Sequence, residues 1–104
     1  MKPGTNSQPG PIIPIMSYST TDEVLKRANL ANAGLGATVY SKDIARAEAI
    51  ARRLETGSVW INKMEMPNPA VYMGGIKESG IGGEGGKHGL LSYAHTKSLF
   101  FSKL

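Results

Sequence analysis

The sequence has 104 residues and no cysteine. That absence excludes a disulfide scaffold, a thiolate zinc site, an iron–sulfur cluster and a cysteine nucleophile, because each of them needs a thiol. Long apolar runs are missing too, and no stretch reaches the about 20 residues that a membrane-spanning helix requires. The residues before Pro9 hold one basic side chain and no apolar core, which is not typical of a secretory signal. We therefore expect no membrane partner and a cytoplasmic location.

Acidic residues are scarcer than basic ones, with 8 Asp and Glu against 12 Lys and Arg, so the formal net charge is +4. A basic balance raises nucleic acid as a partner. The basic residues are dispersed along the chain, however, and no aromatic residues interleave with them as stacking platforms. The two histidines, His88 and His95, have no third ligand beside them. We expect neither a nucleic-acid partner nor a bound metal.

Strands and helices alternate in the first part of the chain. Apolar residues make up 40% of the sequence, which suits one small globular domain. Residues 1–10 are expected to form a flexible N-terminal arm, and residues 11–104 the domain. Extended, β-branched runs predict strands over residues 12–18, 35–40 and 58–62. With a helix between each pair, they predict an α/β fold with a βαβαβ unit joined by right-handed crossovers.

The two expected helices carry start and stop signals. Thr20 and Glu23 have the spacing of a capping box, and Gly34 is expected to end the first helix. Before the second helix, Ser41 offers a cap and Asp43 an acidic first-turn residue. Gly57 is expected to end that helix.

Eight of the 13 glycines lie between Gly74 and Gly89, and they predict a loop held by its surroundings. Within it, residues 80–85 satisfy the GxGxxG spacing of a dinucleotide fingerprint. The motif does not follow a first strand, and an acid about 20 residues further on would lie beyond the chain, so these are interpreted as structural glycines. About one helical turn is expected over residues 90–95, and a terminal strand over residues 96–104.

Two segments make the sequence resemble a known family. They are Gly-Ser-Val-Trp-Ile-Asn at residues 57–62 and Met-Gly-Gly-Ile-Lys-Glu-Ser-Gly-Ile-Gly at residues 73–82. Together they resemble the C-terminal part of the aldehyde dehydrogenase superfamily, and the similarity covers about nine-tenths of the chain. The resemblance implies a fragment of the catalytic domain, followed by a Gly-rich loop and a C-terminal strand that joins a neighbouring subunit's sheet.

The family oxidises aldehydes to acids with NAD or NADP, by attack of a cysteine thiolate. In the family, the nucleophile, the general base and the cofactor domain all precede the portion seen here. The family's Glu-x-Phe-Gly-Pro segment aligns with residues 7–11, which lack both the glutamate and the phenylalanine. We therefore expect no catalytic and no cofactor-binding residue, and no cofactor bound by this chain alone.

The resemblance carries over two site residues. Met73 stands where the family often has an aromatic residue lining the aldehyde tunnel, and its thioether would keep that wall apolar. Glu84 aligns with a loop glutamate that lies near the active site and has been discussed in proton transfer, although a solvated loop glutamate is the simpler interpretation. Gly83 stands where the family commonly has arginine, and residues 85–89 also depart from its usual sequence. Trp60 and the pair Phe100–Phe101 are expected to be core or interface aromatics.

These observations predict a truncated aldehyde dehydrogenase-like polypeptide, an oxidoreductase by ancestry and inactive alone. An alternative is a non-catalytic interaction module that pairs with full-length dehydrogenase subunits, or with itself, through residues 96–104. A third possibility is a gene fragment whose remaining codons lie upstream.

Overall fold

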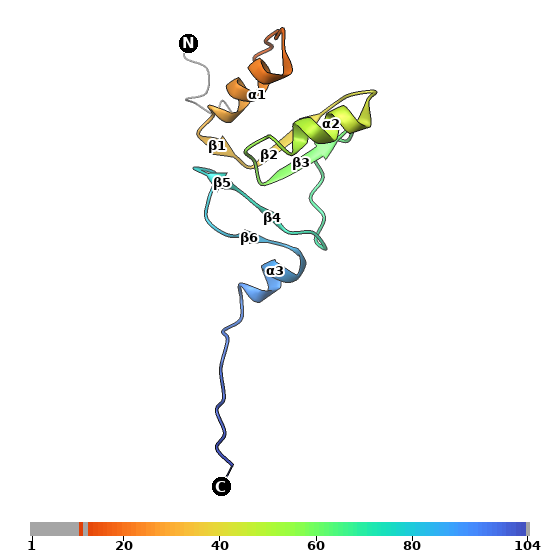
Figure 1. Cartoon of the computed structure of the whole chain (residues 1–104). Coiled ribbons are helices and arrows are strands. Elements are labelled where there is room, and N and C mark those ends of the chain that lie inside the picture. Colours follow the sequence, from red (N-terminus) through yellow and green to blue (C-terminus); the bar gives the residue numbers. More distant parts are fainter. Residues whose placement is uncertain (1–10, 12, 104) are drawn as a thin grey trace.

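The computed structural model describes residues 11 and 13–103, so the expected arm over residues 1–10 lies outside the described part. Helices and strands alternate along the chain (Figure 1). The helices are α1 (Thr21–Asn29), α2 (Ile44–Ala51) and α3 (Gly86–Leu91). The strands are β1 (Ala33–Gly34), β2 (Gly36–Val39), β3 (Ser58–Ile61), β4 (Met73–Gly74), β5 (Ile76–Lys77) and β6 (Gly83–Glu84). None of the helices in this part is long and apolar enough to cross a membrane.

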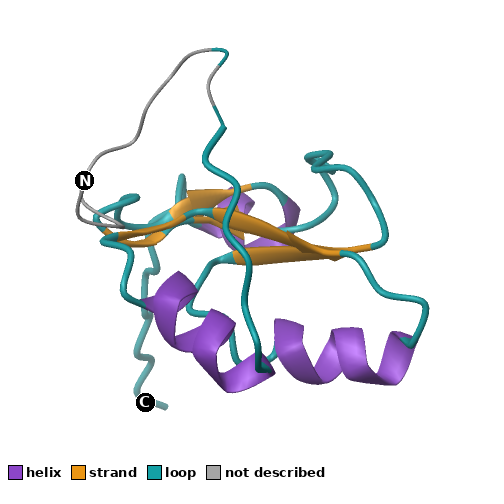
Figure 2. Ribbon diagram, turned by 90° about the horizontal axis from the view of Figure 1, so that it is seen from above, coloured by secondary structure: helices purple, strands orange, loops and turns teal. Residues whose placement is uncertain are grey.

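A parallel βαβ unit forms the centre of the molecule. Strands β2 and β3 pair in parallel, from Gly36 opposite Ser58 to Val39 opposite Ile61. Helix α2 makes the crossover between them and packs on both strands. Figure 2 shows α1 and α2 on the same side of the strands. The α/β fold class is therefore confirmed.

The first expected strand does not form. Residues 13–18 have no strand pairing, and Ile13 and Ile15 are 80% and 93% exposed. This segment is held instead by the Arg27 guanidinium, which donates to the carbonyl of Ser17 at 3.0 Å. A strand needs a hydrogen-bonding neighbour, and none lies beside this segment in the described part of the chain. The unit observed over these residues is thus βαβ, one strand short of the expected βαβαβ.

The helix starts follow local capping chemistry. The Thr20 hydroxyl accepts from the backbone N–H of Glu23, as expected, while the Glu23 carboxylate accepts from Ser19 N–H. At α2 the cap is Asp43, whose carboxylate accepts from Arg46 N–H at 3.0 Å, and Ser41 instead accepts from Asp43 N–H. The helix starts were predictable because each depends on residues within four positions.

The helix ends were predicted too far along the chain. Helix α1 ends at Asn29, and Gly34, the expected stop, lies in β1 opposite Ile76. A Cβ at Gly34 would lie 2.7 Å from the carbonyl oxygen of Glu55 and 2.8 Å from Ile76. Glycine is needed there because two distant segments pack against its backbone. Helix α2 likewise ends at Ala51, six residues before Gly57.

The glycine-rich segment is more ordered than a loop. Strand β5 pairs antiparallel with β1, and β6 pairs antiparallel with β4. Helix α3 begins within the glycines at Gly86, earlier than the expected turn over residues 90–95. These pairings join residues more than ten positions apart or lie across a turn, so local sequence could not indicate them.

The expected terminal strand has no partner among residues 11 and 13–103. Residues 96–103 form neither helix nor strand and run away from the rest of the molecule (Figure 1). Leu99, Phe100 and Phe101 are 70%, 94% and 88% exposed. Among the described residues only Leu25 and Ala47 form a buried apolar core. The radius of gyration is accordingly 18.7 Å, compared with about 13 Å for a compact domain of this size.

Candidate functional site

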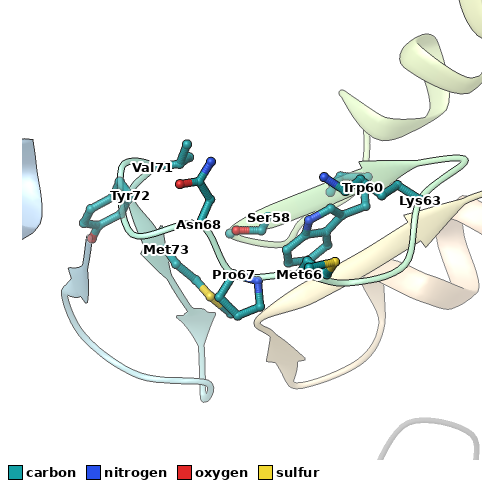
Figure 3. Close-up of a pocket in the computed structure, with 11 residues that line it drawn as sticks. Ser58, Trp60, Lys63, Met66, Pro67, Asn68, Val71, Tyr72 and Met73 are labelled. Atoms are coloured by element: carbon teal, nitrogen blue, oxygen red, sulfur yellow. The ribbon is translucent and has the colours of Figure 1, made fainter. Parts of the chain in front are cut away.

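A hollow of about 360 Å³ opens between β3 and the connection that leads to β4. Strand β3 supplies one wall and the connection with Met73 supplies the other (Figure 3). The hollow is lined by Gly57, Ser58, Val59, Trp60, Lys63, Met66, Pro67, Asn68, Val71, Tyr72 and Met73. This volume lies in the range of small-molecule sites.

The two ends of the hollow differ in charge, because Lys63 lies at one of them. Figure 3 shows Trp60, Lys63 and Met66 at one end, and Val71 and Tyr72 at the other. Ser58, Pro67, Asn68 and Met73 lie between them. Apolar side chains dominate the lining, and an apolar wall with a few polar groups is typical of a site that takes an organic ligand.

Met73 and Glu84, the two residues carried over from the resemblance, lie directly opposite each other. They are register partners in the antiparallel pair of β4 and β6. Met73 is half-buried and lines the hollow beside β3. Glu84 is exposed and borders a second hollow of about 570 Å³, together with Lys87, Leu90 and Tyr93. The structure therefore brings the two residues together in one strand pair, and each of them lines a different hollow.

The glycines of the GxGxxG stretch do not form a phosphate cradle. Gly85 has a φ of 76°, and a Cβ there would lie 2.5 Å from the Val71 carbonyl oxygen. A Cβ at Gly83 would lie 2.5 Å from the Met73 carbonyl oxygen. At Gly80 and Gly82, the first two glycines of that spacing, a Cβ would meet nothing within 4 Å. They lie between strands β5 and β6, whereas a dinucleotide fingerprint joins a strand to a helix. The stretch therefore does not have the topology of a dinucleotide fingerprint.

The histidines take part in no metal grouping. In residues 11 and 13–103 no three His, Cys, Asp or Glu side chains gather as metal ligands. The His88 ring packs edge-on against Tyr72, with centroids 6.1 Å apart. Trp60 is half-buried and lines the hollow, whereas Phe100 and Phe101 are exposed.

Comparisons with known proteins give the family. The sequence model of the aldehyde dehydrogenase family matches residues 7–99. Aldehyde dehydrogenase LUC3 of a Fusarium species is 42% identical over 94 residues, which cover 90% of this chain and 20% of that protein. Betaine aldehyde dehydrogenase 2 of Rhizobium meliloti is 38% identical over 93 residues, which cover 89% and 19%.

A solved structure agrees with these sequence matches. The structure of an aldehyde dehydrogenase from Bacillus cereus in complex with NAD+ superposes with a TM-score of 0.83. It is 39% identical, over 86% of this chain and 18% of that one. The chain spans about a fifth of the length of the curated relatives it matches. The chain belongs to the aldehyde dehydrogenase family.

The sequence did not single out most of the residues that line the hollow. Ser58, Lys63, Met66 and Asn68 belong to no motif of catalytic chemistry. Only their position in the sequence could have indicated them, since they lie within a strand or in the connection between that strand and the glycine-rich motif. Loops that follow strands are common sites of binding residues in α/β proteins.

Proposed function

We propose that this chain forms part of an aldehyde dehydrogenase catalytic domain and lines the aldehyde-binding site. The reaction at that site is the NAD(P)-dependent oxidation of an aldehyde to an acid. The hollow beside Met73 is the observation that carries this proposal, because Met73 is the tunnel-wall position implied by the family resemblance. Family membership over residues 7–99 supports it. Met73 serves as an apolar wall, and Glu84 is the loop carboxylate on the facing strand.

The chain alone is proposed to be inactive. The family's covalent step requires a cysteine thiolate, and this sequence has no cysteine. The GxGxxG spacing does not form a dinucleotide fingerprint, because Gly80 and Gly82 lie between two strands and not between a strand and a helix. The nucleophile and the cofactor site are therefore assigned to protein outside these 104 residues.

Two assays test this function. The purified chain, mixed with NAD+ or NADP+ and a panel of short aldehydes, should give no increase in NAD(P)H absorbance. A chimera of the Bacillus cereus enzyme keeps its own residues up to the position of residue 12 and takes residues 13–99 of this chain in place of the matching segment. It should oxidise aldehydes. Turnover by the chain alone would refute the inactivity. A folded chimera with a reactive cysteine but no turnover would refute the role in the aldehyde site.

A second candidate is a non-catalytic interaction module, and the extended residues 96–103 favour it. Leu99, Phe100 and Phe101 are largely exposed, and an extended segment can add as a strand to another sheet. The partner would be a full-length dehydrogenase subunit or a second copy of this chain. Co-expression with aldehyde dehydrogenase LUC3 should then yield a mixed oligomer. Separation of the two proteins at micromolar concentration would remove this candidate.

The expected cytoplasmic location stays a prediction. Fractionation of cells that produce the tagged chain would check it, and recovery with a membrane or organelle fraction would contradict it.

A further inference from the structure

The polar side chains that line the hollow beside β3 can all donate a hydrogen bond, and Lys63 among them can only donate. Lys63 carries an ammonium group, Ser58 a hydroxyl and Asn68 an amide. The side-chain oxygen Oδ1 of Asn68 accepts from Ala70 N–H at 3.0 Å, and the side-chain amide nitrogen is the group that donates. Within the described residues, Lys63 forms no ion pair.

Acidic residues are missing from the same lining. None of the residues that line the hollow carries a carboxylate, so Lys63 is the one charged group of its lining. The nearby carboxylate of Glu65 lies outside the lining, on the Gly36 side of the Trp60 ring. An anion would gain from the ammonium and from the neighbouring donors. A cationic ligand would meet like charge at Lys63 within the hollow.

The arrangement along the hollow places its one charged side chain at one end. Figure 3 shows Lys63 beside Trp60 at one end, with Met73 and Pro67 further along and Tyr72 beyond them. A ligand with its carboxylate at the Lys63 end would therefore run its apolar chain past Ser58 toward Met73. A chain of about six carbons suits a cavity of this size.

We infer that the hollow takes an apolar chain ending in a carboxylate, so that the aldehyde served by this site is an oxo acid. The carboxylate lies at Lys63, and the aldehyde group points toward Met73. That the ligand is an aldehyde rests on the proposed function. The preference for a carboxylate rests only on the residues that line the hollow.

Trp60, the only tryptophan of the chain, gives a direct measurement because it lines the hollow. Three probes with the same six-carbon chain, hexanoate, 1-hexanol and hexyltrimethylammonium, are titrated against the purified chain while its fluorescence is recorded. Dissociation constants on the order of millimolar are expected for ligands of this size. Hexanoate should bind about three- to tenfold more tightly than hexyltrimethylammonium, and this difference should shrink in 0.5 M NaCl.

Matched variants locate the preference. Lys63→Met should weaken hexanoate binding about three- to tenfold, while 1-hexanol binding changes by less than about twofold. Lys63→Arg should keep the hexanoate preference. Lys42→Met, which removes an exposed charge outside the hollow, should leave all three dissociation constants unchanged. Far-UV circular dichroism checks that each variant keeps its fold.

The outcomes separate the two proposals. Equal binding of the three probes, tighter binding of the cation, no fluorescence change, or a hexanoate preference that survives Lys63→Met would overturn the inference. In the active chimera, 6-oxohexanoate should have a higher kcat/KM than hexanal, and Lys63→Met should reverse that order. An inactive chimera together with a Lys63-dependent hexanoate preference would refute the proposed function and leave the binding site in place.

Discussion

The βαβ unit and the glycine-rich segment are held together in different ways. In the first, Asp43 caps α2, and β2 and β3 pair over four residues each. In the second, strands of two residues pair across turns or with a distant segment, and glycines let backbones approach one another. Local signals specify the first region, whereas the second depends on contacts with the rest of the chain.

The two regions meet at a few defined positions. Gly57 contacts Gly74, and Lys77 reaches from β5 to the end of α1 and to Glu55. The side chain of Ser79 accepts from Gly34 N–H at 2.8 Å. Substitutions at these contact positions should therefore affect the glycine-rich segment more than substitutions at the helix caps do.

The largest effect is expected for Gly57→Ala. A Cβ at Gly57 would overlap the carbonyl oxygen of Gly74, which is backbone and cannot turn aside. The substitution should lower the free energy of unfolding by about 3 kcal/mol, because β3 and β4 must separate. Urea denaturation measures the change. Gly82→Ala is the control, since that glycine has a φ of 78° and no atom within 4 Å, so it should cost only about 1 kcal/mol.

The next effect is expected for Lys77→Met, which removes the ammonium that ties the segment to α1. Its Nζ donates to the carbonyl oxygens of Asn29 at 2.7 Å and Ala31 at 3.2 Å, and pairs with Glu55 at 2.8 Å. The substitution should lower the free energy of unfolding by about 1.5 kcal/mol. It should also speed amide exchange at Glu78, whose N–H donates to the carbonyl oxygen of Asn32. Amide exchange followed by NMR checks this, and unchanged exchange at Glu78 would show that Lys77 is not the tie.

A smaller and more local effect is expected for Asp43→Ala. The carboxylate accepts from Arg46 N–H, so its removal should cost about 1 kcal/mol and fray only the start of α2. Thermal unfolding gives the stability change, and amide exchange gives its location. Lys42→Ala, one residue earlier and exposed, should be nearly neutral. Faster exchange in the glycine-rich segment of the Asp43 variant would contradict the separation of the two regions.

The smallest effect concerns pH. The pKa of Glu23 is lowered from its ordinary value of 4.5, first by the Ser19 N–H that its carboxylate accepts and then by Arg27. A lowered pKa means that this carboxylate contributes stability above its ordinary pKa and loses it as pH falls through the folded value. Glu23→Gln should therefore flatten the decline of stability between about pH 5 and pH 3. Denaturation curves at those pH values would contradict this if the two proteins declined in parallel.

The sequence predicted correctly those features of the fold that depend on residues a few positions apart. Thr20 as the cap of α1 and the strand after Gly57 were both predictable from neighbouring residues. Residues 13–18 have the composition of a strand, yet composition supplies no partner, and in the described part of the chain they remain unpaired. The hollow could not be predicted, because it needs Lys63 and Met73 to approach β3 through the path of the connection between them.

The family, the absence of a cysteine nucleophile and the helix starts follow from the amino-acid sequence alone, because they depend on residue identity and short spacing. Two groupings follow only from the fold: Met73 lies opposite Glu84 in a strand pair, and Lys63, Ser58 and Asn68 line one hollow. Such groupings arise when long-range backbone pairing brings separate segments together, and no local pattern carries that information.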